Sequence, residues 1–149
     1  MNALYDEVEL YYNRAITIYK SQLGANDPNV SKTKNNLANS YMKQNKLVEA
    51  EQMYKEVLTA AHEESYGEIS ESNKSIWMVA EERQERSAQG ATLDDPNSGN
   101  PSWYQMRVES PTVANTLKNL SALYRRLGKF EAAETLESVA QRSSRQQVS

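Results

Sequence analysis

The 149-residue sequence contains no cysteine, one phenylalanine and one histidine. Without cysteine the chain can form neither a disulfide framework nor a thiolate metal site. No apolar run approaches the ~20 residues of a membrane span, and no signal-peptide core follows Met1. We therefore expect a cytosolic chain that has no metal or other cofactor and does not insert into membranes.

Groups that could carry catalysis are also scarce. The one histidine, His62, is followed by Glu63 and Glu64, but Tyr66 stands where a zinc-protease helix has its second histidine. A nucleophilic triad needs a positioned histidine, and His62 falls near the expected end of a helix. We expect no enzyme activity. Convergence of His62 with carboxylates in a pocket would revive that alternative.

The charge and hydropathy of the chain limit its partners and its core. A net charge of -3 and a pI near 5.3 argue against binding to nucleic acid or to membrane surfaces. With 38% hydrophobic residues and a mean hydropathy of -0.81, the chain can bury a thin apolar layer more easily than a thick core.

Apolar residues recur at helical spacing in six segments, which predicts an all-α fold. Asp27-Pro28 and Ser110-Pro111 are typical helix starts, with a capping side chain followed by proline in the first turn. The predicted helices span residues 2–22, 28–44, 46–64, 72–87, 111–127 and 129–143, with Ser72 as the expected start of the fourth.

Two segments are expected to lack stable structure. Residues 88–108 are rich in glycine, proline and polar residues, so we predict a flexible loop, from which Trp103 either docks on the body or forms an exposed aromatic site. Residues 144–149 are expected to fray. The helix before the loop carries Trp77, which we expect to anchor that helix over a groove or on the adjacent repeat.

Residues 35–58 return, slightly changed, as residues 118–140. The offset is 83 residues at every shared position. The shared residues are Asn36, Leu37, Tyr41, Lys46, Ala50 and Glu51, which recur as Asn119, Leu120, Tyr124, Lys129, Ala133 and Glu134.

The spacing of these residues matches the tetratricopeptide repeat (TPR), in which Leu-Ala-x-x-Tyr precedes a second helix with Ala and an aromatic residue. The resemblance implies an all-α TPR helix-hairpin solenoid, a fragment of a right-handed superhelix. We predict the second helix of an incomplete TPR over 1–24, a complete TPR over 27–66, a non-TPR insertion over 70–109 and a final TPR over 110–143. The first repeat fits at Leu37, Ala38, Tyr41, Ala50 and Tyr54, and the last fits at Leu120, Ser121, Tyr124 and Ala133, with Glu137 in place of the second aromatic residue.

A more specific resemblance rests on longer segments. The stretches "DPNVSKTKNNLANSY", "NKSIWMVAEER" and "SPTVANTLKNLSALYRRLGKFEAAETLE" resemble the last TPR repeats of the kinesin light chain, including the insertion before the final one. The period of 42 residues between Val8 and Ala50, longer than the usual ~34, fits as well. This resemblance implies a non-catalytic module that links a microtubule motor to cargo adaptor proteins by binding their acidic peptide segments. It also implies a cytoplasmic, microtubule-associated location, and contact with the motor heavy chain through a region absent from this sequence.

The TPR resemblance implies which residues would contact a peptide, because the first helix of each hairpin lines the concave groove. Asparagine amides can pair with an extended peptide backbone, and lysine and arginine favour acidic side chains. Cations on a helix surface are also common as solvated residues without a ligand. The expected groove residues are Lys32, Asn35, Asn39, Lys43, Asn115, Lys118, Arg125 and Arg126, whereas Asn36 and Asn119 are expected to serve helix packing.

Other functions remain open from the sequence. The segment could be a structural end-cap of a solenoid whose cargo binds earlier repeats. It could also be a generic TPR scaffold of the co-chaperone type, although that clamp has lysine where this chain has Asn35. An incomplete repeat exposes an apolar face, so we also expect a tendency to self-associate.

Overall fold

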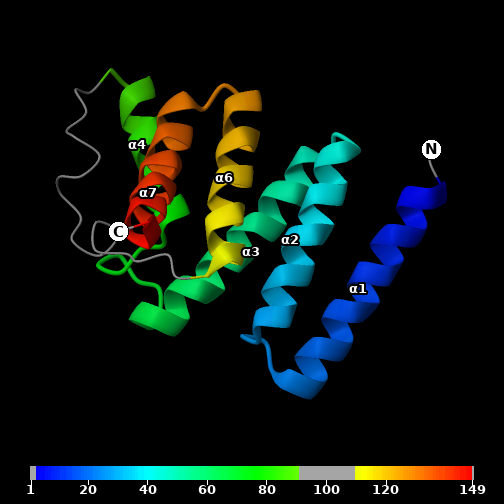
Figure 1. Ribbon diagram of the computed structural model, residues 1–149. Helices are drawn as coiled ribbons and strands as arrows, with labels where there is room; N and C mark the ends of the chain where they lie inside the picture. Colours follow the sequence, from blue (N-terminus) through cyan, green and yellow to red (C-terminus); the bar gives the residue numbers. More distant parts are fainter. Residues whose placement is uncertain (1–2, 91–109, 149) are drawn as a thin grey trace.

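The computed structural model describes residues 3–90 and 110–148, and the side chains of residues 4–90 and 110–141. These residues form helices and no strand, apart from one isolated bridge between Ser70 and Asn73, so the prediction of an all-α fold is confirmed (Figure 1). None of the described helices is long and apolar enough to cross a membrane. The helices are α1 (Ala3–Leu23), α2 (Pro28–Lys43), α3 (Leu47–Tyr66), α4 (Ile76–Ala88), α6 (Pro111–Arg126) and α7 (Phe130–Val148).

Two boundaries differ from the prediction. Helix α4 begins at Ile76, with Ser75 as its N-cap residue, because residues 70–73 form a tight turn in which Ser70 and Asn73 exchange two backbone hydrogen bonds of 3.1 Å. The expected start at Ser72 was therefore wrong. Helix α7 continues to Val148, beyond the predicted end at residue 143. Most of the predicted loop, including Trp103, lies outside the described residues.

The turns of the two hairpins have the same backbone conformation, as the sequence repeat would lead one to expect. Asn45 and Gly128 occupy the same position and have positive φ angles of 62° and 79°. Glycine adopts this conformation at no steric cost, and asparagine tolerates it better than most residues. In each turn the next residue donates a backbone hydrogen bond of 2.8 Å to the carbonyl oxygen of the tyrosine that the two repeats share, from Lys46 to Tyr41 and from Lys129 to Tyr124.

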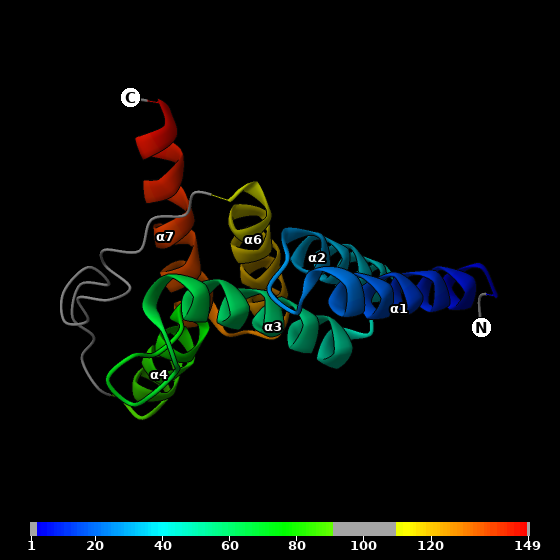
Figure 2. The same ribbon diagram turned by 90° about the horizontal axis from the view of Figure 1, so that it is seen from below.

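The helices stack in one layer of hairpins, with α1 at one end and α7 and α4 at the other (Figures 1 and 2). Helix α1 packs on α2, α2 pairs with α3, and α6 pairs with α7. Although 83 residues separate their sequences, the α6–α7 hairpin packs directly on α2 and α3. Most residues that fit the repeat pattern are buried in the core, namely Leu37, Ala38, Ala50, Tyr54, Leu120, Tyr124 and Ala133, whereas Tyr41 is half-buried.

Helix α4 packs against the second helices of the hairpins, mainly α7 and also α3. Its residues Ile76 and Ala80 are fully buried there. The side chain of Gln84 accepts hydrogen bonds from the backbone N–H groups of Glu131 (2.9 Å) and Ala132 (3.3 Å), at the start of α7. The first N–H groups of a helix have no partner within the helix, so α4 caps α7 as well as packing on it.

A carboxylate on α4 joins three helices. Glu81 Oε1 accepts hydrogen bonds from Lys55 Nζ on α3 (2.7 Å) and from the Tyr124 hydroxyl on α6 (3.1 Å). Burial of the phenol, with Glu81 beside it, raises the pKa of Tyr124 above its ordinary value. The tyrosine therefore stays protonated and remains a donor.

The histidine is a structural residue that holds the turn between α3 and α4. His62 is buried, and its Nε2 lies 2.7 Å from Asn73 Oδ1. The amide nitrogen of Asn73 donates to the backbone carbonyls of Tyr66 (3.0 Å), Gly67 (3.3 Å) and Glu68 (2.8 Å). Because the amide nitrogen is the donor in these contacts, Oδ1 is the acceptor and His62 carries its proton on Nε2.

This arrangement predicts that Asn73→Ala lowers the free energy of unfolding by about 2–4 kcal/mol, because it leaves a buried donor and three carbonyls without their partner. Urea unfolding followed by circular dichroism measures the change. Asn29→Ala, at an exposed residue whose side chain makes no hydrogen bond among the described residues, is the control, with an expected change within about 0.5 kcal/mol. Equal stability of the two variants would contradict the assigned role of Asn73.

Candidate functional site

The first helices of the two hairpins, α2 and α6, lie side by side (Figure 1). All of their charged residues are lysine or arginine. Helix α2 contains three lysines and α6 contains one lysine and two arginines, with no aspartate or glutamate in either. Helix α3, a second helix, contains five glutamates and one lysine. The fold therefore gathers positive charge on the layer of first helices and negative charge on the second helix behind them.

Three of these cations are free. Lys32, Lys43 and Lys118 are exposed and make no ion pair or hydrogen bond with any residue that the structure describes. Lys34 differs, because it lies on the opposite side of α2 and its Nζ is 3.6 Å from Glu56 of α3. The three free lysines were all predicted as groove residues.

The two arginines are held by neighbours. Arg125 donates two hydrogen bonds of 2.7 Å to the carboxylate of Glu137 on α7, and Arg126 donates one of 2.8 Å to the side chain of Asn45. Glu137 also accepts from the Ser121 hydroxyl at 2.7 Å. The charge of Arg125 is thus largely compensated by Glu137. The positive charge available to a ligand therefore comes mainly from the lysines.

Two of the predicted asparagines, Asn35 and Asn39, face the α2–α6 interface. Asn35 is buried, and its Oδ1 accepts from Thr116 at 2.9 Å and from Asn119 at 3.5 Å. Asn39 Oδ1 accepts from the Tyr54 hydroxyl at 2.6 Å and from Asn119 at 3.0 Å. The assignment of Asn35 to peptide contact is therefore corrected, because its oxygen is used in helix packing. The packing role expected for Asn119 is confirmed.

We name the predicted groove residues of α2 and α6 the cationic face, leaving out the buried Asn35 and Arg125, whose charge is paired with Glu137. Its members share exposure to solvent and a position among the predicted groove residues. They are Lys32, Lys43, Asn115, Lys118 and Arg126, with the half-buried Asn39 between them. Both helices lie where the sequence repeat predicted them.

The last hairpin differs from the inner one on its outer side. Tyr54 and Leu58 of α3 are buried against the next hairpin, whereas Glu137 and Gln141 take the same positions of α7. Polar groups thus replace apolar ones on a side of α7 against which no further hairpin of the described residues packs. Glu137 is paired with Arg125, which itself replaces Met42. The sequence could have indicated this pair, because Met42 and Tyr54 of the inner repeat are both replaced, by Arg125 and Glu137, in the last repeat.

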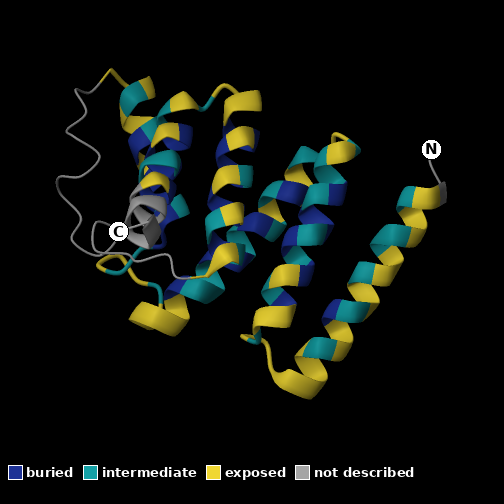
Figure 3. Cartoon of the chain, viewed as in Figure 1, coloured by how far each residue is buried: buried dark blue, intermediate teal, exposed yellow. Residues whose placement is uncertain are grey.

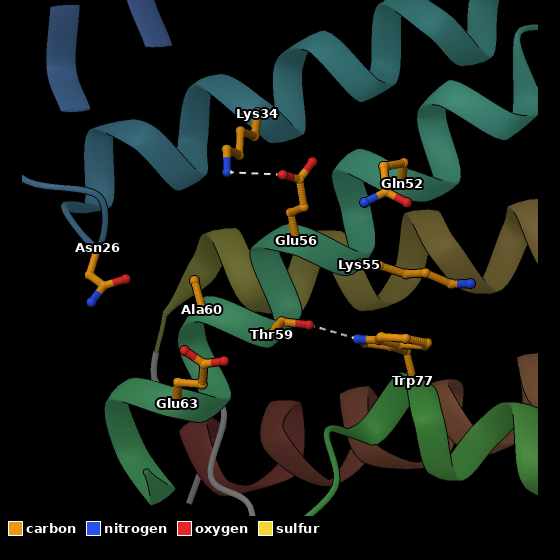
Figure 4. A pocket seen from close by; sticks show the side chains of 9 residues that line it. All are labelled: Asn26, Lys34, Gln52, Lys55, Glu56, Thr59, Ala60, Glu63 and Trp77. Carbon is orange, nitrogen blue, oxygen red and sulfur yellow. Dashed lines mark hydrogen bonds and ion pairs between the residues drawn. The ribbon is translucent and has the colours of Figure 1, made fainter. Parts of the chain in front are cut away.

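Apart from the cationic face, the structure has a cleft on α3 between α2 and α4, which the sequence did not predict (Figure 4). This cleft of about 440 Å³ is bordered by the Lys34–Glu56 ion pair and by Trp77 of α4. The Trp77 ring donates from Nε1 to the Thr59 hydroxyl at 2.9 Å, and Lys55 Nζ lies 4.6 Å from its centroid. Trp77 therefore anchors α4 on α3 rather than covering the cationic face.

The cleft does not bring together a catalytic set of side chains. His62 is turned toward Asn73, and the Thr59 hydroxyl accepts from Trp77. Among residues 3–90 and 110–148, no three histidine, aspartate or glutamate side chains form a group that could hold a metal ion. The alternative of an enzyme required His62 to lie beside carboxylates in a pocket. These parts of the chain contain no such arrangement in the cleft.

Comparison with protein families gives the class of protein. Models of the tetratricopeptide repeat match residues 4–63 and residues 113–145, which together make up more than half of the chain. The two matched spans are separated by the segment that contains α4. The chain is therefore a tetratricopeptide repeat protein. TPR proteins act as scaffolds for protein–protein interaction, and the matches do not distinguish one TPR family from another.

The Arg125–Glu137 pair predicts a pH-dependent contribution to stability. Arg125 holds the pKa of Glu137 below its ordinary value of 4.5, so the contribution is present above that value and is lost as the pH falls through the lower, folded-state pKa. We expect Arg125→Ala to lower the melting temperature at pH 7. The difference from the unchanged chain should shrink as the pH falls below 4.5.

Thermal unfolding followed by circular dichroism from neutral pH down to about pH 3 measures this difference. Arg86→Ala, at an exposed arginine of α4, is the control and should give a small, pH-independent change. A constant deficit of Arg125→Ala across the whole range would mean that the carboxylate of Glu137 is not the partner that matters.

Proposed function

We propose that this TPR protein is a non-catalytic adaptor that binds acidic peptide segments of partner proteins along the cationic face. The observation that carries the proposal is the charge of the two first helices, which hold six cations and no acid. Three of the lysines have no partner among the described residues. An extended peptide with acidic side chains would gain attraction from Lys32, Lys43 and Lys118 without displacing an existing ion pair.

Polar groups near the lysines would orient the peptide. Asn36, which we expected to serve helix packing, is half-buried on α2 and makes no hydrogen bond among the described residues, and Asn115 is exposed at the start of α6. Each amide offers a donor and an acceptor to a peptide backbone. Asn39 would contribute less, because its oxygen is already shared by Tyr54 and Asn119.

The partner class follows from the resemblance to the kinesin light chain. We propose that the acidic segments belong to cargo adaptor proteins and that the module serves microtubule-based transport in the cytoplasm. The sequence stretches that carry the resemblance include α4, which packs on α7 and is built into the repeat rather than appended to it. A generic TPR scaffold with a different acidic partner would use the same face.

A second function, that of a solenoid end-cap, is favoured by one observation. The outer side of the last hairpin is polar where the inner hairpin is apolar, with Glu137 and Gln141 in place of Tyr54 and Leu58. Terminal repeats of solenoids need such a polar outer face for solubility. Peptide binding and end-capping use different surfaces and are compatible.

Charge reversal tests the adaptor proposal. A labelled peptide with several glutamates around a central tryptophan should bind the chain, and Lys43→Glu/Lys118→Glu should weaken binding by about tenfold or more. Added salt should weaken the binding of the unchanged chain, because exposed charges are screened. Fluorescence anisotropy gives the dissociation constants.

The matched control is Lys20→Glu/Arg86→Glu, which changes the net charge equally but lies on α1 and α4, away from the cationic face. It should leave the affinity within about twofold of the unchanged chain. Equal loss in both double variants would assign the effect to net charge alone. No binding by the unchanged chain would remove the adaptor role and leave the end-cap function.

The end-cap function makes its own prediction. Arg125→Met/Glu137→Tyr/Gln141→Leu restores the inner-hairpin residues on the outer side of the last hairpin. The variant should associate into higher oligomers at concentrations where the unchanged chain does not, because it exposes an apolar stacking surface. Light scattering after size-exclusion chromatography measures the mass. An unchanged mass would show that these polar residues do not block stacking.

A further inference from the structure

The cleft on α3 beside Trp77, which we call the α3 cleft, lies on the opposite side of α2 from the cationic face. Its walls come from α3, from α4, and from α2 with the turn before it (Figure 4). Its volume of about 440 Å³ falls in the range of roughly 300–1,000 Å³ that is usual for ligand pockets. The adaptor proposal makes no use of this cleft, so its side chains call for a separate explanation.

The two lysines of the α3 cleft are already paired. Lys55 Nζ donates to Glu51 at 2.9 Å and to Glu81 at 2.7 Å. Lys34 Nζ lies 3.6 Å from Glu56 Oε1. The carboxylates beside these lysines carry more negative charge than the lysines carry positive charge. An anionic ligand would therefore have to compete with carboxylates that are already in place.

The acceptors of the α3 cleft, by contrast, are largely unused. Glu63 lies in the exposed last turn of α3, and its carboxylate makes no ion pair or hydrogen bond with any residue that the structure describes (Figure 3). Glu56 Oε2 is buried and has no hydrogen-bond partner among those residues, and the 3.6 Å from Oε1 to Lys34 is too long for a hydrogen bond. Because a buried acceptor without a donor is unfavourable, a positively charged ligand with several N–H groups would gain most here.

The two carboxylates are spaced like side chains of an extended peptide. Glu56 and Glu63 are seven residues apart on α3, which is two turns or about 10 Å along one side of the helix. In a polyproline II segment, residues three apart point the same way and are separated by about 9 Å. Ala60 lies between the glutamates and Trp77 borders the same space from α4, so the middle of the cleft is apolar. A segment of the form Arg-x-x-Arg therefore matches the cleft in charge and in spacing.

We propose that the α3 cleft binds a basic segment of a partner protein, with two arginines three residues apart placed against Glu56 and Glu63. Arginine fits better than lysine, because its planar guanidinium donates two hydrogen bonds to one carboxylate and is weakly hydrated. Its aliphatic stem would lie on Ala60 and Trp77. The α3 cleft is separate from the cationic face, so one molecule would hold an acidic segment and a basic segment at the same time.

Nuclear magnetic resonance of the isotope-labelled 149-residue chain tests the proposal. The blocked peptide Gly-Arg-Pro-Pro-Arg-Gly should shift the indole N–H signal of Trp77, which borders the cleft, and should saturate the shift with a dissociation constant of about 1 mM or below. The variant Trp103→Phe assigns that signal. Citrulline in place of both arginines keeps the shape of the peptide, removes its charge and should abolish the shift.

Two further peptides test the chemistry and the spacing. Lysines in place of both arginines should weaken binding by about threefold or more, because an ammonium group cannot bond a carboxylate with two parallel N–H groups. Gly-Pro-Arg-Arg-Pro-Gly, with the arginines side by side, should also bind about threefold or more weakly, since only one of them can reach a carboxylate at a time.

Variants of the chain test the acceptor. Glu63→Gln should weaken the binding of the first peptide by about fivefold or more, because it removes one carboxylate and keeps the size of the side chain. Glu64→Gln is the matched control, since Glu64 is exposed and does not line the cleft, and it should change the affinity by less than about twofold. Lys43→Glu/Lys118→Glu should likewise stay within about twofold, so the outcome is independent of the adaptor proposal.

Several results would overturn the proposal. The Trp77 signal would not saturate at peptide concentrations up to about 10 mM if the cleft holds no basic segment. Equal weakening by Glu63→Gln and Glu64→Gln would assign the effect to net charge alone. Equal affinity for the citrulline peptide would show that apolar groups hold the peptide. Equal affinity for the lysine peptide or for the adjacent-arginine peptide would contradict the assigned chemistry or spacing.

Discussion

The packing of α6 against α2 and α3 is the contact on which the rest of the molecule depends. Each hairpin alone has one apolar side, and a single TPR hairpin cannot bury that side by itself. The contact buries Tyr54 and Leu58 of one hairpin together with Leu117 and Leu120 of the other. It brings together segments that the sequence separates by 83 residues, and the cationic face exists only because α2 and α6 become neighbours.

A seam of polar groups runs through this contact and fixes its register. The hydroxyl of Tyr54 and the amide of Asn119 share Asn39 Oδ1, and Thr116 donates to Asn35. Burial raises the pKa of Tyr54, so its hydroxyl keeps the proton that it donates. An apolar interface tolerates small shifts, whereas satisfied buried hydrogen bonds favour one alignment of the two helices. We interpret Asn35, Asn39 and Asn119 mainly as residues that align the hairpins.

Helix α4 makes the insertion part of the solenoid. Its Glu81 bonds to Lys55 and Tyr124, and its Gln84 caps α7, so it connects both hairpins from the side of the second helices. Among the described residues, this position leaves the outward side of the first helices uncovered. Within the described residues, the two ends of the stack differ, because α1 exposes large apolar side chains and the last hairpin presents the Arg125–Glu137 pair. The molecule therefore has a cationic side, an apolar end and a polar end.

Apolar spacing, Asp27-Pro28 and Ser110-Pro111, and the echo between the two repeats were sufficient to predict the helices, the hairpins and most of the core. These features are local or periodic, and a single sequence records them directly. The start of α4 was mispredicted because a backbone turn at residues 70–73, and not the capping tendency of Ser72, sets it. The role of His62 could not be read from the sequence, because its partner Asn73 lies beyond the end of the helix.

The sequence by itself determined which surfaces are available. It places the cations on the first helices, and it places Glu137 and Gln141 in the last repeat where the inner repeat has Tyr54 and Leu58. Only the tertiary structure decided which of those side chains are free. Asn35 and Arg125 carry the groups that a peptide surface needs, but partners on neighbouring helices already hold those groups. A side chain's own helix fixes the direction in which it points, whereas its availability depends on distant segments that pack beside it.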